Sequence, residues 1–330
     1  MLAPNPTAGL FAPPWWLRSA DLQTMLANLP PMRGLIQRRA HQLCAQATPW
    51  LIDCGDEVRL QAWYTPAAAA SRRTALLLHG WEGSSESCYV LSAGALLLQS
   101  GYNIVRLNLR DHGGTQHLNR ELFHSCRLPE LCGAVAAIAK RCAGAPLYLG
   151  GFSLGGNFLL RAAAAPAVPA NVAGAVAISP VLDPHHTLDA LEGRFGIYQQ
   201  YFVRRWTRSL RGKQRAWPQD FNFERLLRSR NLRQMTADLV AEHTDFADID
   251  AYLDGYAITG TRLSTLAVPA RILTSTDDPI IPVGDLSRLA EPPLLEVTRT
   301  EFGGHCGFHE RFTGPSFADQ YLLAQFAALG

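Results

Sequence analysis

The sequence Gly151-Phe152-Ser153-Leu154-Gly155-Gly156 joins an apolar run, residues 147–152, to a helical run, residues 154–165. A Gly-x-Ser-x-Gly motif between a strand and a helix is typical of a turn that exposes a nucleophilic serine oxygen. The residue at the centre of such a turn has a strained backbone and the chain packs closely around it, so the flanking positions require glycine. We therefore predict that Ser153 is a catalytic nucleophile, and a tight structural turn is the alternative.

Short β-rich runs alternate with helical stretches on both sides of this motif. Several of the runs are continuously apolar, which is typical of strands buried on both faces of a parallel sheet. The predicted strands cover residues 58–64, 74–79, 103–108, 147–152, 172–178, 271–274 and 294–298, and the predicted helices cover 87–99, 131–141 and 154–165. This order predicts the α/β class, with a mostly parallel sheet flanked by helices.

The alternation of strands and helices divides the chain into three parts. Residues 1–57, which include Pro13-Pro14-Trp15-Trp16, are predicted to be an ordered but irregular N-terminal arm packed on the core. Residues 58–183 and 267–330 are predicted to form the α/β core. Residues 184–266 contain helical pattern but no convincing strand, and we predict that they form an inserted helical lid, a name kept below for this range.

A serine hydroxyl needs a base to take its proton and a third group to orient that base, and both should follow in the order Ser, Asp, His. His305 lies in the glycine-rich loop 303–307 after the last predicted strand, and we predict that it is the base. Asp277 and Asp278 follow the preceding strand, and only one can contact His305. We prefer Asp278 because it stands four residues before Pro282, and Asp277 stays open as the alternative.

The tetrahedral intermediate of ester cleavage needs two amide donors for its oxyanion. One should come from Leu154, directly after the nucleophile, and the other from the loop after the third core strand. That loop reads His79-Gly80-Trp81-Glu82-Gly83, which makes the Trp81 amide the second predicted donor.

These motifs resemble the YheT-like branch of the α/β-hydrolases, whose members carry a His-Gly-x-x-Gly-Ser-Ser loop and a Gly-Phe-Ser-Leu-Gly-Gly-Asn elbow. Both patterns are present here, at residues 79–85 and 151–157. The loop at 108–114 and the Asp277-Asp278-Pro279 turn are also similar to that branch. The resemblance implies an α/β-hydrolase fold and a serine esterase or lipase-like activity without a cofactor, with Ser153, Asp278 and His305 at the matching positions.

Composition limits the other classes of function. Hydrophobic residues make up 48% of the chain and the net charge is only +2, which favours a compact protein over a nucleic-acid binder. The seven cysteines form no CxxC pair, and His305 and His309 lack a third ligand, so neither a disulfide framework nor a metal site is predicted.

The sequence shows no secretory signal and no apolar stretch long enough to cross a bilayer, so we expect a cytoplasmic location. The oligomeric state stays open.

The lid carries a basic and aromatic stretch from Tyr201 to Trp217. It could contact an anionic lipid surface or nucleic acid, but a solvated helix face with the aromatic rings turned inward is the favoured interpretation. Tyr198, Phe202 and Trp206 recur at helical spacing and are predicted to line the substrate pocket, with core packing as the alternative.

We therefore predict hydrolysis of small carboxylic esters with short to medium acyl chains, through an acyl-enzyme on Ser153. An alcohol O-acyltransferase would use the same acyl-enzyme and is the first alternative. A non-catalytic ligand-binding protein with the same fold is the second. Stable membrane insertion is not expected, and peripheral contact with lipid is left open.

Overall fold

The computed structural model of this chain describes residues 11–69, 71–193 and 196–330. Its centre is an eight-stranded sheet in the order β1-β2-β4-β3-β5-β6-β7-β8. Strand β2 pairs antiparallel with β1 and β4, and all other neighbouring strands are parallel. The mostly parallel α/β architecture is confirmed. The strands are β1 (Thr48–Asp53), β2 (Arg59–Thr65), β3 (Thr74–Leu78), β4 (Asn103–Leu107), β5 (Leu147–Phe152), β6 (Val172–Ile178), β7 (Ala270–Ser275) and β8 (Leu295–Thr300).

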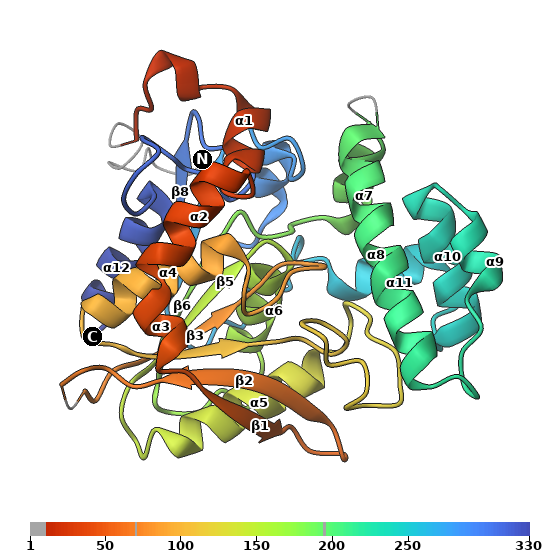
Figure 1. The fold of residues 1–330 in the computed structure, drawn as a ribbon, viewed down its shortest axis with the longest axis horizontal. Helices are drawn as coiled ribbons and strands as arrows, with labels where there is room; N and C mark the ends of the chain where they lie inside the picture. Colours follow the sequence, from red (N-terminus) through yellow and green to blue (C-terminus); the bar gives the residue numbers. More distant parts are fainter. Residues whose placement is uncertain (1–10, 70, 194–195) are drawn as a thin grey trace.

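Helices cover both faces of the sheet and form the lid (Figure 1). Three helices precede β1 in the chain: α1 (Ala20–Leu26), α2 (Pro30–Arg39) and α3 (His41–Ala45). The core helices are α4 (Cys88–Gln99), α5 (Leu128–Arg141), α6 (Leu154–Ala163) and α12 (Phe317–Ala328). The lid contains α7 (Pro184–Glu192), α8 (Ile197–Ala216), α9 (Glu224–Arg228), α10 (Leu232–His243) and α11 (Ile249–Tyr256). The two described 3-10 helices are η2 (Trp15–Leu17) and η4 (Val283–Arg288).

Residues of the central strands β3 to β7 enter two separate apolar clusters, because successive side chains of a strand point to opposite faces of the sheet. In β3, Leu76 and Leu78 join the cluster that includes α5, α6 and the lid. Ala75 and Leu77 join the cluster that includes α2, α4 and α12. Both faces of the sheet are therefore buried, as the continuous apolar runs predict.

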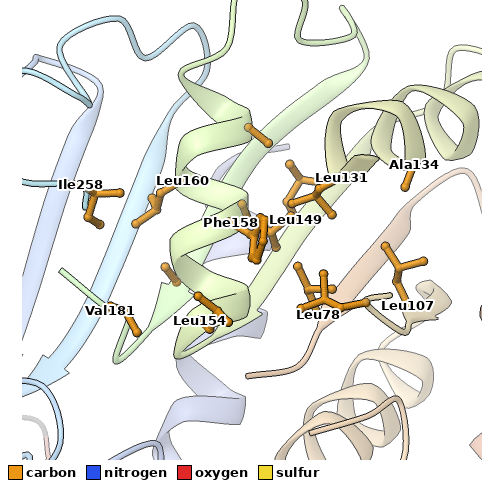
Figure 2. Packing of buried hydrophobic residues seen from close by; sticks show 14 of the residues in the cluster. Leu78, Leu107, Leu131, Ala134, Leu149, Leu154, Phe158, Leu160, Val181 and Ile258 are labelled. Carbon is orange, nitrogen blue, oxygen red and sulfur yellow. The ribbon is translucent and has the colours of Figure 1, made fainter. Parts of the chain in front are cut away.

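Helix α6 follows the predicted elbow and is buried along its whole length. Figure 2 shows Leu154 and Phe158 of this helix with Leu149 of β5 and Leu78 of β3, and Leu131 of α5 on the neighbouring side. Apolar contacts on several sides hold the helix in place. The first turn of α6, which begins directly after Ser153, is thus a rigid part of the core.

The N-terminal part of the chain differs from the sequence prediction. Its described residues are not irregular: they form three α-helices and the edge strand β1, which pairs in register with β2. Helix α2 shows little separation of polar and apolar residues, so its sequence carries no clear helical pattern. The helix is held on α4 by the buried side chains of Met32 and Ile36.

The described residues of the lid range are helical and contain no strand. Most arginines of its basic stretch are exposed, in agreement with a solvated helix face, but Lys213 is fully buried. Its ammonium group lies 2.9 Å from Asp111 in the loop after β4. Among the described helices, none is both long enough and apolar enough to cross a membrane.

Candidate active site

Ser153 lies at the turn between β5 and α6 with φ of 52° and ψ of −122°. A Cβ atom on Gly151 would lie 2.6 Å from the carbonyl oxygen of Gly155, and one on Gly155 would lie 2.3 Å from the carbonyl oxygen of His79. Real side chains do not tolerate such distances, so both glycines are required by close backbone approach. The turn has the strained backbone and the crowded neighbours that the motif predicts.

The loop after β3 lies beside this serine. A Cβ atom on Gly80 would approach the Cβ of Ser153 to 3.0 Å. The amide of Trp81 donates no hydrogen bond within the described part of the chain. Leu154 is the first residue of α6, and N–H groups in the first turn of a helix have no partner within that helix. Both predicted oxyanion donors thus lie in segments adjacent to Ser153.

Two buried histidines hold this loop, in the hydrogen-bonded structural role that the sequence predicts for His112 and the other histidines outside the 303–307 loop. His79 accepts a hydrogen bond from the Leu109 amide at 3.1 Å, and His112 accepts one from the Glu82 amide at 3.1 Å. Burial lowers the pKa of His79 to about 3 and that of His112 to about 4, so both rings are neutral and one nitrogen of each can accept. The sequence does not identify the amides that these rings bind, because Leu109 and Glu82 each lie 30 residues from their partner histidine.

A half-buried tyrosine supports the same loop from the other side. The hydroxyl of Tyr89 accepts a hydrogen bond from the Gly80 amide at 3.1 Å, and its ring packs on Phe152, the residue before Ser153. The side chain therefore links the loop after β3 to the elbow.

His305 and Asp278 lie in contact at the ends of β8 and β7. His305 Nδ1 is 3.0 Å from Asp278 Oδ2, while Asp278 Oδ1 accepts the amide hydrogens of Ile280 and Ile281, each at 2.9 Å. Asp277 points elsewhere: its Oδ1 accepts the Gly304 amide at 2.9 Å. The structure therefore brings Asp278, and not Asp277, to the imidazole of His305.

The surroundings of His305 act on its charge in opposite directions. Burial disfavours the imidazolium ion, but the Asp278 carboxylate and the neighbouring Cys306 outweigh burial, and the pKa of His305 lies well above its usual value. The Cys306 amide donates to the hydroxyl of Ser179 at 3.4 Å, at the end of β6. An imidazole held by a carboxylate in this way is suited to accept a proton from a serine.

Ser153 and His305 line the same cavity, which has a volume of about 370 Å³. The three lid residues predicted to form the pocket, Tyr198, Phe202 and Trp206, line it as well. Phe202 stacks on Trp81 with ring centroids 5.1 Å apart, and Trp206 meets the same ring edge-on at 5.3 Å. The aromatic stripe therefore both lines the cavity and packs the lid on the core. Further apolar walls come from Leu188, Leu191, Leu232, Leu239 and Leu253.

One cluster elsewhere has the residue types of a metal site. Asp183, His186 and Asp285 each offer a ligand atom within 4.8 Å of the others. The guanidinium of Arg288, however, pairs with both carboxylates, and His186 Nδ1 lies 2.6 Å from Asp285. Because Arg288 already supplies the positive charge, these residues do not fit a metal ion well.

Comparisons with known proteins bear on the family and the fold. A family model described as alpha/beta hydrolase fold matches residues 75–312. The chain is 27% identical to an Escherichia coli (strain K12) protein named "Putative esterase YheT", over 77% of this chain and 76% of that protein. It is 23% identical to the mouse protein named phospholipase ABHD3, over 73% of this chain and 60% of that protein. The similarity to YheT confirms the resemblance seen in the sequence motifs.

Solved structures show the same fold. The esterase Pf2001 of Pyrococcus furiosus aligns with a TM-score of 0.56 at 16% identity and covers 86% of this chain and 89% of its own. A membrane phospholipase A described as a bacterial virulence factor aligns with a TM-score of 0.55 at 16% identity and covers 94% of each chain. At this identity the likeness concerns the fold alone. Because the family model covers well over half of the residues, this protein belongs to the α/β-hydrolase fold family.

Proposed function

We propose that the protein hydrolyses carboxylic esters with Ser153 as nucleophile, His305 as general base and Asp278 as the residue that orients His305. The observation that carries this proposal is the 3.0 Å contact between His305 Nδ1 and Asp278 Oδ2, in a cavity that Ser153 also lines. The relatives named as an esterase and a phospholipase support ester cleavage.

The proposed reaction uses these groups in two stages. The Ser153 oxygen attacks the ester carbonyl carbon while His305 takes the serine proton, and the resulting oxyanion faces the Trp81 and Leu154 amides. Collapse of the intermediate breaks the bond to the alcohol, which leaves with the proton from His305. Water, deprotonated by the same histidine, then releases the acid from Ser153. Asp278 stays ionised and stabilises the imidazolium at each stage.

The cavity walls support an apolar acyl group. Tyr198, Phe202 and Trp206 line one side, and leucines of α7, α10 and α11 continue the apolar surface. Each methylene that the cavity buries contributes about 0.8 kcal/mol to binding until the cavity is full. Esters with short to medium acyl chains are the proposed substrates.

A cytoplasmic location is also proposed, and the seven free thiols support it because such thiols are typical of a reducing compartment.

Labelling with a fluorophosphonate probe tests the nucleophile, since only an activated serine reacts rapidly. Wild-type protein should be labelled, and Ser153→Ala should lose both the label and hydrolysis of p-nitrophenyl butyrate. Ser125→Ala is the matched control, because Ser125 lines the same cavity and should remain dispensable for labelling. Equal labelling of the Ser153 variant would refute the proposal. Product analysis with and without added alcohol then separates hydrolysis from acyl transfer.

A further inference from the structure

The cavity beside Ser153 is largely apolar, yet it contains the side chain of an arginine. Among the described residues that line it, Arg205 of α8 is the only arginine or lysine. The side chain is half-buried and contacts the loop that carries the predicted oxyanion donor. A guanidinium placed at this position needs an explanation, because burying a positive charge without an anionic partner is unfavourable.

The bonds of Arg205 are all to uncharged groups. Its Nη1 donates to the Tyr201 hydroxyl at 3.0 Å, and its Nη2 donates to the main-chain carbonyl of Glu82. The ion pairs formed among the described residues do not include Arg205. A guanidinium carries five N–H donors in a planar fork, so these two bonds leave donors available for a carboxylate or phosphate group.

The carboxylates that act near Arg205 offset its charge only in part. Arg205 and Arg208 both lower the pKa of Glu82, but burial has the larger effect and raises that pKa to about 7. A large fraction of Glu82 is therefore uncharged at neutral pH. Asp111 also acts on Glu82, but its own carboxylate is paired with Lys213 at 2.9 Å. Arg204 and Arg208 on the same helix are exposed and add further positive charge.

We propose that Arg205 forms an anion subsite of the active-site cavity, which binds a phosphate or carboxylate group carried by the ester substrate. The inference rests on the proposed function and specifies its substrate class as anionic esters. Phe202 and Trp206 both pack on the ring of Trp81. These two contacts hold the turn of α8 that carries Arg205 against the loop after β3, so the subsite lies near the proposed reacting bond. A fork of parallel N–H donors matches the two oxygens of such a group.

Two matched pairs of esters test this subsite and distinguish the sources of the anion. Hexanoylglycerol and hexanoylglycerol phosphate differ by a phosphate on the alcohol side. Ethyl hexanoate and monoethyl adipate differ by a carboxylate at the end of the acyl side. In at least one pair the wild type should favour the anionic ester, and Arg205→Gln should lower that preference in kcat/KM by about tenfold or more, the loss typical of a charged hydrogen bond.

The controls separate a local effect from a change in overall charge or stability. Arg204→Gln removes the same charge from an exposed neighbouring position and should keep the wild-type preference. Arg205→Lys retains the charge without the fork and should recover part of the preference. If Arg205→Gln keeps the anionic-to-neutral ratio of kcat/KM within twofold of wild type for both pairs, the subsite is refuted, even though ester hydrolysis by Ser153 would stand.

A measurement on wild-type protein alone covers the case in which the variant does not fold. Hexyl phosphate should slow fluorophosphonate labelling of Ser153 at concentrations about tenfold lower than hexanol, because the two probes share one alkyl chain and differ in charge. Equal protection by the two compounds would overturn the subsite. Absence of any labelling would instead count against the proposed nucleophile.

Discussion

Lys213 Nζ lies 2.9 Å from Asp111 Oδ1, and both side chains are buried between the lid helix α8 and the loop after β4. The ammonium group also donates to the carbonyl oxygens of Asn119 at 2.6 Å and Glu121 at 2.9 Å. All three of its donors are thus used. The pair joins the lid to the core beside the loop after β3, and it explains why one cation of a basic helix is turned inward.

Removing one partner of this pair should be strongly destabilising. Lys213→Met leaves the Asp111 carboxylate buried without its cation, and such losses reduce the free energy of unfolding by about 3–5 kcal/mol. Urea unfolding followed by circular dichroism measures the change. Arg211→Met is the control, because Arg211 is exposed on the same helix and its loss should change stability by about 0.5 kcal/mol or less. Equal effects of the two substitutions would contradict the anchoring role.

The two adjacent aspartates should respond differently to the same substitution. Asp278→Asn removes the carboxylate that contacts His305 and, if the proposed function holds, should reduce turnover by up to about 10⁴-fold, as loss of the orienting carboxylate does in serine proteases. Asp277→Asn keeps an acceptor for the Gly304 amide and should mainly affect stability. Steady-state kinetics and thermal unfolding of both variants make the comparison. The opposite order of kinetic effects would transfer the orienting role to Asp277.

The pH dependence of hydrolysis should reflect His305. Only the neutral imidazole can accept the serine proton, and the pKa of His305 lies well above its usual value, so kcat/KM should rise with pH above neutrality. Asp278→Asn should move this rise to lower pH, because burial then acts without the opposing carboxylate. Cys306→Ala should shift it in the same direction. A pH–rate profile that is unchanged in the Asp278 variant would exclude His305 as the titrating group.

The same shift in pKa affects stability with a defined sign. Because the pKa of His305 is raised in the folded state, the imidazolium stabilises the fold fully below the unfolded value of about 6.5. This contribution is lost as the pH rises through the folded pKa. Urea unfolding of wild type should therefore show a fall in the free energy of unfolding on the alkaline side, and the fall should be smaller in Asp278→Asn.

The lid aromatics should set the preferred acyl length. Phe202→Ala and Trp206→Ala enlarge the cavity, so the optimum among p-nitrophenyl esters should move to longer chains, with each added buried methylene contributing about 0.8 kcal/mol. Val203→Ala is a control for destabilisation, because Val203 is buried on the same helix outside the cavity wall. If both aromatic variants keep the wild-type chain-length profile and lose only thermal stability, the stripe serves packing alone.

Local sequence was sufficient for the central part of this fold. The apolar run before Ser153, the glycines of the elbow and the composition of the helix after it are local patterns, so the sequence predicts these elements directly, although their packing on β3 and α5 involves distant residues. The alternation of strands and helices along the chain, and the acidic and histidine loops after β7 and β8, can be recognised in the same way. The helices before β1 were less predictable, because α2 lacks a clear apolar stripe and is held by packing on α4.

Contacts between residues far apart in the sequence cannot be predicted from such local patterns. The spacing to Pro282 favours Asp278 over the adjacent Asp277 but leaves both open, and the path of the backbone after β7 brings only Asp278 to His305. Lys213 and Arg205 are two cations of one basic helix, yet one is buried against Asp111 and the other lines the cavity. The physical reason is that charge and periodicity are properties of a segment, whereas the partner of each side chain depends on how distant segments pack together.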